Sequence, residues 1–353
     1  MTIARTILRI GVSVFSILLA MLTGAILILL IGKDPILAYG FLFRGAFGSL
    51  PSIGETIVKV TPLIFTGLAA VFSYQCGMLN LGIEGQFIAG AIAANWLSTI
   101  VLPFTGAANM ILSLIGGMAA GAVWGAIPGL LKAFRNLNEM IIGILLNYVA
   151  LLFMGYLYAG PLMEANIPQT AAIEPADRLS RILPPTRVHA GILIALAVLI
   201  LIYYYLYNTA SGFRLRVVGN NPVAALVNGL PVKRMTVISF VASGAISGLG
   251  GAVEVLGVSY RLMGGFGAGF GFDGVAIALI GQLNPIGTGF VAYLFAVLRV
   301  GANTMQVGAG IPSAIVDVVQ AIIIIFAVGA AAFVSLPEFQ QLTARIFRKK
   351  QGA

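Results

Sequence analysis

Apolar stretches about as long as a membrane-spanning helix fill most of this 353-residue chain. A helix needs about 20 predominantly apolar residues to cross the hydrocarbon core of a bilayer. Ten windows of this kind follow one another along the sequence, at 10–31, 56–74, 82–102, 108–131, 140–158, 190–207, 235–257, 272–287, 289–307 and 312–332. The sequence therefore predicts an all-α, polytopic integral membrane protein of about ten spans, forming a single transmembrane domain over residues 1–353.

The composition excludes an ordinary soluble enzyme. Only 9% of the residues are charged and 59% are hydrophobic, whereas soluble domains carry roughly 25% charged residues. The net charge of +9 is spread over loops, which is typical of cytoplasmic loops beside anionic lipids and not of nucleic-acid binding. The single cysteine, Cys76, excludes an internal disulfide and any cysteine-based metal cluster.

Lysine and arginine in the loops predict the orientation, because cytoplasmic loops are enriched in both. An even number of spans with both termini in the cytoplasm fits the distribution best, with an outer loop at 159–189 and a cytoplasmic loop at 208–234. We expect the first window to be a retained span, since it is longer than the apolar region of a signal peptide. Twelve of the 20 basic residues then lie inside: Arg5, Arg9, Lys132, Arg135, Arg214, Arg216, Lys233, Arg234, Arg345, Arg348, Lys349 and Lys350.

Small residues recur every four positions in two of the windows. They are Gly117, Gly121, Gly125 and Gly129 in the fourth window, and Ser243, Ser247 and Gly251 in the seventh. Such faces let helix backbones approach closely inside a membrane, so we interpret them as packing seams.

Two stretches interrupt the helical pattern at membrane depth. One is 77–86, and the other is 264–274 followed by 281–287. Irregular backbone survives there only when protein covers it or when it lines a wet cavity. Broken segments at comparable places in two halves of a chain indicate a transport site.

Motifs of catalysis and metal binding are missing. The sequence holds no Gly-x-x-x-x-Gly-Lys-Ser/Thr loop, no His-Glu-x-x-His and no Gly-x-Ser-x-Gly. The only histidine, His189, falls at the outer end of a predicted span, where we expect an interfacial residue. We therefore assign no catalytic residue and no metal site to this chain.

The cytoplasmic loop contains a clear helix signal. Asn221 before Pro222 is typical of a helix start, and Gly229 with Pro231 is typical of its end. The predicted helix, 222–228, is too short to span a membrane. Judged by its physical properties alone, it is either a surface anchor or a handle that another protein grips.

Two motifs resemble ABC importer permeases of the branched-chain amino acid, ribose and simple-sugar family. Ala224, Ala225, Gly229 and Pro231 match the Glu-Ala-Ala loop of these permeases, although Val223 replaces its glutamate. Asn80, Gly82, Glu84, Gly85 and Gln86 match the family's Asn-x-Gly-x-Glu-Gly-Gln. The resemblance covers roughly residues 50–330 and is closest to nucleoside permeases, on the stretches 138–142, 146–148, 271–276, 284–285, 305–306 and 316–320.

The resemblance implies a transport subunit in the inner membrane that works with partners. A separate cytoplasmic ATPase would hydrolyse ATP with magnesium, so this chain would need no cofactor of its own. A second, different permease would complete the pore, and a substrate-binding protein would dock outside. The ATPase would grip the short helix, where a small Ala225 permits close approach. The implied coupling residues are Arg214, Arg216, Asn221, Pro222, Ala224, Ala225, Gly229 and Pro231, although ordinary positive-inside topology also explains the two arginines.

Polar residues inside the spans are the candidates for a substrate pathway, because such residues are costly in a membrane. They are Asn80, Glu84, Gln86, Asn147, Asp273, Asn303, Gln306, Asp317 and Gln320. Structural roles are the alternatives: Glu84 complements a helix dipole, Asp273 begins the eighth span and Asp317 pairs with Arg299. Buried lysine and arginine are scarce, which favours a small neutral polar solute over an anion.

The expected function is therefore that of an ABC importer permease, closest to one for nucleosides. Within this class simple sugars, branched-chain amino acids and riboflavin are alternatives. Outside it, an ion-coupled secondary transporter would need no cytoplasmic helix, and an integral-membrane enzyme is disfavoured by the missing catalytic residues.

Overall fold

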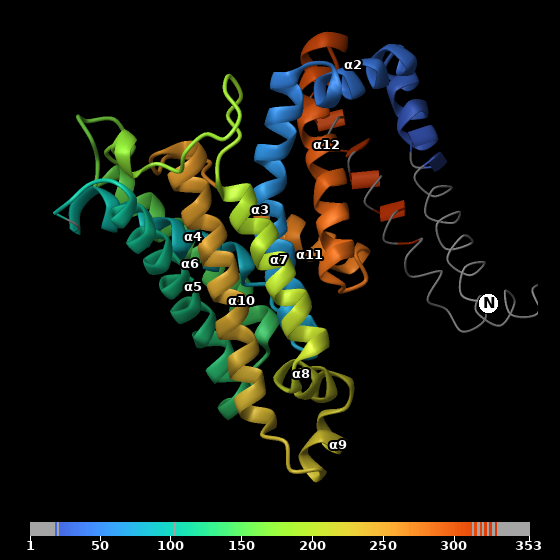
Figure 1. Cartoon of the computed structure of the whole chain (residues 1–353). Helices are drawn as coiled ribbons and strands as arrows, with labels where there is room; N and C mark the ends of the chain where they lie inside the picture. Colours follow the sequence, from blue (N-terminus) through green and yellow to red (C-terminus); the bar gives the residue numbers. More distant parts are fainter. Residues whose placement is uncertain are drawn as a thin grey trace, which may run out of the picture. The chain divides into compact units, whose positions relative to one another are not determined.

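The described part of the chain is built from helices (Figure 1). The computed structural model describes residues 18, 19, 21–101, 103–267, 269–312, 314, 315, 318, 319, 321, 322, 325, 326 and 329. The helices are α2 (Pro35–Phe47), α3 (Leu50–Tyr74), α4 (Ile83–Trp96), α5 (Ala107–Arg135), α6 (Glu139–Ala159), α7 (Gly191–Asn208), α8 (Ala210–Asn220), α9 (Pro222–Val227), α10 (Val232–Glu254), α11 (Phe270–Ile280) and α12 (Pro285–Ala309), with π-helical turns η1 (Leu97–Val101) and η3 (Val255–Ser259) and the 3-10 turn η2 (Pro175–Asp177).

Six of these helices are long and apolar enough to cross a membrane: α3, α5, α6, α7, α10 with η3, and α12. They coincide with six of the predicted windows, and the all-α, multi-pass membrane fold is confirmed. The window 82–102 holds α4 and η1. The windows 10–31 and 312–332 lie partly outside the described residues, so ten spans stay a prediction.

The eighth window, 272–287, is not one span. Its helix α11 has 11 residues, or about 16 Å at 1.5 Å per residue, which is about half of a hydrocarbon core. A turn at 281–283 separates α11 from α12. Within this turn Gln282 and Leu283 both adopt positive φ.

Two helices were not predicted from the sequence. α2 lies between the first two windows, and Asp34 caps it by accepting the N–H of Ile36 at 2.8 Å. α8 carries Arg214 and Arg216 in the loop 208–234, and Thr209 caps it by accepting the N–H of Gly212 at 3.1 Å. Neither helix has the apolar length that marks a span, so a search for spans passes over both.

The described residues divide into two compact units. One contains residues up to Ile53 and from Val297 onward, and the other is Gly54–Ala296. In the first unit α2 packs closely on α12, because a Cβ placed on Gly45 would lie 2.3 Å from Thr304 Oγ1.

The core of the second unit is the predicted glycine seam, formed by α5 and α10. A Cβ on Gly121 would come within 2.2 Å of the Gly244 carbonyl oxygen, and one on Gly248 within 2.5 Å of the Gly117 oxygen. α4 joins the same seam, since a Cβ on Gly90 would lie 2.2 Å from Gly248 O. Only glycine permits these approaches, which are closer than any real Cβ contact.

Hydrogen bonds of buried polar groups hold the predicted outer loop, 159–189, in place. Asp177, within η2, is fully buried and accepts hydrogen bonds from the Gly106 N–H and from Asn109 Nδ2, the latter at 2.9 Å. His189 is also buried, which differs from the expected interfacial position. Its Nδ1 accepts the N–H of Gly191 at 3.1 Å, at the start of α7.

Candidate functional site

The two predicted helix breaks meet at Glu84. This residue lies in the first turn of α4, and its carboxylate reaches the loop before α11. Glu84 Oε1 accepts the backbone N–H of Gly269 at 2.7 Å, and Oε2 accepts the N–H of Gly271. Only 7% of Glu84 is exposed. The buried carboxylate therefore connects the two breaks, although 185 positions separate Glu84 from Gly269.

The carboxylate accepts hydrogen bonds from backbone N–H groups at the start of α11. The first N–H groups of any helix lack a partner within that helix, and their positive end of the dipole attracts an anion. Gly269 caps α11 but brings no side chain to bond those groups. Glu84, which is remote in sequence, supplies this cap. Because it also lies in the first turn of α4, its charge complements the dipoles of two helices rather than the one predicted.

A second group of buried amides holds the first break itself. Asn80 Nδ2 donates to Gln86 Oε1 at 3.1 Å and to Ser243 Oγ at 2.9 Å. Asn80 Oδ1 accepts the N–H of Gly82 at 2.9 Å. Ser243 in turn donates to the carbonyl of Ala69 on α3 at 2.7 Å. The network thus connects the break to α3 and α10.

Asn147 on α6 replaces backbone bonds that the break cannot make. Its Oδ1 accepts the N–H of Gly85 at 2.7 Å, and its Nδ2 donates to the Leu81 carbonyl at 2.8 Å. Both are backbone groups at the start of α4, where intrahelical partners are missing. Irregular backbone at membrane depth needs such cover by protein.

The structure brings four of the nine predicted pathway residues together: Asn80, Glu84, Gln86 and Asn147. Asp273 lies in the first turn of α11, as its structural alternative predicted. Asn303 and Gln306 are exposed on α12 and belong to the other compact unit. Asp317 and Gln320, and with them the predicted pair with Arg299, lie outside the described residues. Whether any of the nine contacts a solute stays a prediction.

Sequence reasoning missed the polar role of the two serines on α10. Ser243 and Ser247 were interpreted only as small packing residues. Ser243 bonds Asn80 as described, and Ser247 donates to the Ile83 carbonyl at 2.8 Å. Their spacing of four residues put both hydroxyls on one helix face, which is the signal that was available.

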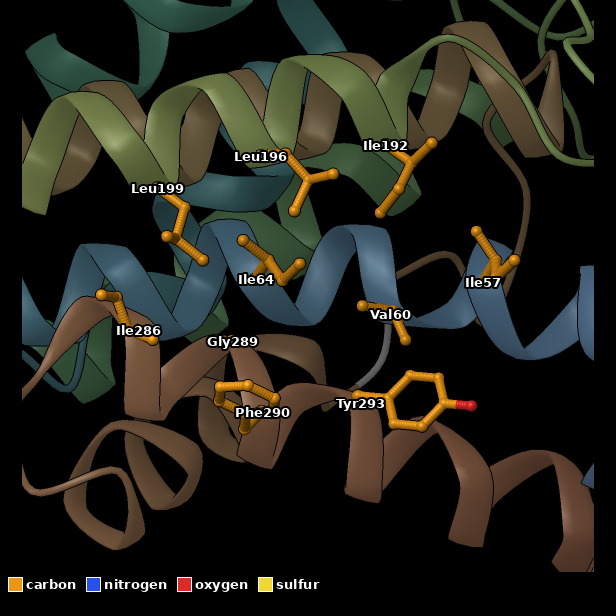
Figure 2. A pocket seen from close by; sticks show the side chains of 10 residues that line it. All are labelled: Ile57, Val60, Ile64, Ile192, Leu196, Leu199, Ile286, Gly289, Phe290 and Tyr293. Atoms are coloured by element: carbon orange, nitrogen blue, oxygen red, sulfur yellow. The ribbon is translucent and has the colours of Figure 1, made fainter.

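Two cavities open between the helices of the larger unit, and both are lined almost entirely by apolar side chains. The first, of about 440 Å³, lies between α3, α7 and α12 (Figure 2). The second, of about 530 Å³, lies between α4, α5 and α6 and includes both tryptophans, Trp96 and Trp124. A polar solute needs precisely placed hydrogen-bonding groups, so neither cavity suits one.

The short helix of the loop 208–234 forms where the sequence predicted it. Asn221 caps α9 by accepting the N–H of Ala224 at 2.9 Å, with Pro222 in the first turn. Gly229 ends the helix with φ +76°, a conformation that favours glycine. In Figure 1, α8 and α9 lie at the end of their unit opposite the loop that joins α6 to α7.

The face that α9 presents differs from the expectation for Ala225. Ala225 is fully buried, and α9 lies against α8 and α10. The large apolar side chains on the exposed side of α9 are instead those of Val223, Leu226 and Val227, which are 71%, 65% and 81% exposed. A partner that grips this helix would therefore meet these three apolar side chains.

The two arginines of α8 are not equivalent. Arg214 is exposed to solvent. Arg216 is half-buried, and its guanidinium lies 4.9 Å from the centre of the Tyr207 ring. Arg216 therefore packs within the chain, which leaves Arg214 as the freer of the two for a partner.

The number and length of the apolar helices define a multi-pass membrane protein. Residues 52–328 match the family described as branched-chain amino acid transport system / permease component, and the chain belongs to this family. It is thus a transport component and not an enzyme.

Three relatives are similar over nearly the whole chain. The guanosine ABC transporter permease protein NupP of Bacillus subtilis is 37% identical over 91% of this chain and 93% of its own. The nucleoside ABC transporter permease protein NupB of Lactococcus lactis is 35% identical over 98% of each. The glucose ABC transporter permease protein TsgB13 of Haloferax volcanii is 33% identical over 92% and 88%. No solved structure matched.

Proposed function

We propose that this chain is the membrane permease of an ABC importer for nucleosides. The observation that carries the proposal is the similarity to NupP and NupB, whose names specify guanosine and nucleosides. The buried polar groups are consistent with it, because they are mainly amides and hydroxyls rather than cationic side chains. A neutral solute with many hydroxyls and ring nitrogens requires hydrogen bonds and no counter-charge.

We further propose that the chain works in the inner membrane with three partners. A cytoplasmic ATPase that binds ATP and magnesium would grip α9 on Val223, Leu226 and Val227. A second, homologous permease would complete the pore, and an extracytoplasmic binding protein would deliver the solute. The apolar, exposed side of α9 supports the contact with the ATPase, because exposed apolar patches of this kind are typical of protein–protein interaction sites. In this arrangement both termini lie in the cytoplasm.

Uptake measurements test the substrate. Cells in which only this gene is deleted should lose high-affinity uptake of radiolabelled guanosine, and expression of the chain should restore it. Excess unlabelled uridine or adenosine should compete, whereas excess glucose should not. Normal guanosine uptake in the deletion strain, grown where the transporter is expressed, would contradict the proposal.

Glucose is the second candidate, since TsgB13 is 33% identical to this chain. The same strain separates the two substrates. A deletion that abolishes glucose uptake and leaves guanosine uptake unchanged would assign the chain to sugar import within the same family.

A further inference from the structure

The backbone that follows α3 is in direct contact with α8. α3 ends in a hydrogen-bonded turn, where Gly77 adopts φ +74° and its N–H donates to the Tyr74 carbonyl at 2.9 Å. A Cβ built on Gly219 of α8 would lie 2.2 Å from the Gln75 carbonyl oxygen and 2.9 Å from the Gly77 nitrogen. Closely packed interiors transmit displacement. Because the first helix break begins at Gly77, a shift of α8 must displace the start of this break or separate the two backbones.

The side chain of Gln75 reaches the second interrupted segment. Gln75 Nε2 donates to the Leu283 carbonyl at 2.8 Å, although 208 positions separate the two residues. Leu283 belongs to the turn 281–283 that follows α11, where Gln282 and Leu283 have φ values of +55° and +54°. Residues other than glycine keep such φ values only where surrounding contacts hold the backbone. The hydrogen bond from Gln75 is one of these contacts.

The half-length helix α11 is therefore held at both of its ends by side chains from the region of the first break. Glu84, within the break, accepts N–H groups at the start of α11. Gln75, two residues before the break, donates to the turn at the end of α11. Because α11 has only 11 residues, a rearrangement of the first break acts on the whole of this helix.

A single residue joins α8 to α9. The N–H of Asn221 donates to the Val217 carbonyl at the end of α8, at 3.1 Å, and its side chain accepts the N–H of Ala224 at the start of α9, at 2.9 Å. Gly219 lies two residues before this joint. A displacement of α9 therefore has a short route to Gln75, through Asn221 and Gly219.

We propose that Gln75 is a positioning residue of the transport cycle, which makes the turn 281–283 and α11 move with α8. The proposal rests on the proposed function for one point, the ATPase that displaces α9. A bond that served only stability would affect ATP hydrolysis and transport alike. Loss of a positioning bond leaves ATP hydrolysis in place and lowers the amount of solute moved for each ATP.

Hydrogen exchange in the purified full-length chain tests the connection without a solute or a partner. The N–H groups of 281–283 donate to carbonyls of α11, so their exchange reports opening of this turn. Gln75→Met keeps the length of the side chain but removes its donor, and should speed this exchange several-fold. Gly219→Ala presses on the Gln75 carbonyl and should also speed it. In the double variant Gly219→Ala should add nothing further, and effects that simply add would overturn the proposal.

Two variants serve as controls for the exchange measurement. Gly155→Ala adds the same methyl group on α6, where the nearest atom to the added Cβ is Tyr158 Oη at 3.9 Å, and should leave the exchange of 281–283 unchanged. Gln75→Lys restores a hydrogen-bond donor and should return the exchange towards that of the wild type. If Gly219→Ala fails to fold, the complete transporter provides a test that needs only Gln75→Met.

That test compares the transporter, purified with its ATPase, before and after trapping with ATP, magnesium and vanadate. Trapping should change the exchange of 281–283 several-fold in the wild type but not in Gln75→Met. The variant should hydrolyse ATP near the wild-type rate and move several-fold less guanosine for each ATP. An equal change in both proteins, or no change in the wild type, would refute the role of Gln75. A Gln75-dependent change in a transporter that moves no guanosine would support this role and contradict only the proposed substrate.

Discussion

The Glu84 carboxylate lies 2.7 Å from the backbone nitrogen of Gly269, and this hydrogen bond joins the two interrupted segments of the chain. One carboxylate lies in the first turn of α4 and caps α11. Rearranging either segment therefore requires that the carboxylate find new partners or leave buried N–H groups unpaired.

Replacing Glu84 should destabilise the fold, and by more in Glu84→Ala than in Glu84→Gln. Glu84→Ala leaves the N–H groups of Gly269 and Gly271 without their acceptor, at a cost of about 1–3 kcal/mol for each unpaired group. Glu84→Gln retains one acceptor but loses the charge, so its effect should be intermediate. Thermal unfolding of the purified protein measures both. Glu174→Gln, at an exposed carboxyl, serves as the control and should unfold like the wild type; equal midpoints for all variants would contradict the capping role.

A methyl group in the glycine seam should disrupt packing of α5 on α10. In Gly121→Ala the new Cβ would meet the Gly244 carbonyl oxygen at 2.2 Å, so the two backbones must separate. Overpacking of this kind costs typically 1–3 kcal/mol. We expect less folded protein in the membrane and a lower unfolding temperature. Gly155→Ala has space around its Cβ and should behave as wild type.

Charges on the exposed side of α9 should separate coupling from folding. Leu226→Asp and Val227→Asp place a carboxylate on the face proposed to meet the ATPase, so normal protein levels should accompany weak ATPase association and lost uptake. Ala225→Glu forces a charge into a fully buried position, which costs folding free energy before any partner binds. Co-purification, protein level and uptake distinguish the two classes. Transport by Leu226→Asp at the wild-type rate, with the ATPase bound, would exclude this face.

Acid should destabilise the loop 159–189 through His189. Burial, together with the nearby Arg187 charge, lowers the pKa of His189 to about 4 from its ordinary 6.5. The unfolded chain therefore binds more protons than the folded one between these values, and stability falls as the pH is lowered from about 6.5 towards 4. Thermal unfolding at pH 7.5 and pH 5 measures the effect. His189→Asn should show a smaller difference between the two pH values; an unchanged difference would assign it to other groups.

Cys76 should be unreactive in the folded protein. It is fully buried, and burial raises the pKa of its thiol to about 11, so little thiolate is present at neutral pH. Maleimide labelling should require denaturation. Because Cys76 does not react, labelling of a Gly352→Cys variant reports the position of the C-terminus alone. The new cysteine should react only with reagent that enters the cytoplasm. Labelling of this variant from outside alone would overturn the predicted orientation.

The loop 208–234 shows which features local sequence preferences can predict. Asn221, Pro222 and Gly229 specify the start and end of α9 through their own backbone preferences, so a single sequence suffices to place the helix. The direction that Ala225 faces depends on α8 and α10, which pack around it. α8 itself has weak apolar character and two arginines in 11 residues, and no span-length pattern marks it.

The candidate site could be predicted only in part for a related reason. Polar residues such as Asn80 and Asn147 stand out within apolar windows, and the broken pattern marked both interrupted segments. Their pairing depends on contacts between distant positions: Glu84 and Gly271 are 187 residues apart. The local pattern of a single sequence does not show such pairs. The hydrogen bonds of Ser243 and Ser247 could not be predicted either, because small side chains in a packing seam already explain both serines.

The helix α10 gives the loop a mechanical connection to the membrane interior. It begins at Val232, one residue beyond Pro231, and continues without interruption to Glu254. On the way it presents Ser243 to Asn80 and Ser247 to the carbonyl of Ile83. α10 is therefore one continuous helix of 23 residues, about 35 Å long, between the loop 208–234 and the start of α4. We therefore expect a displacement of the Val232 end of α10 to reach the start of α4 through these hydrogen bonds.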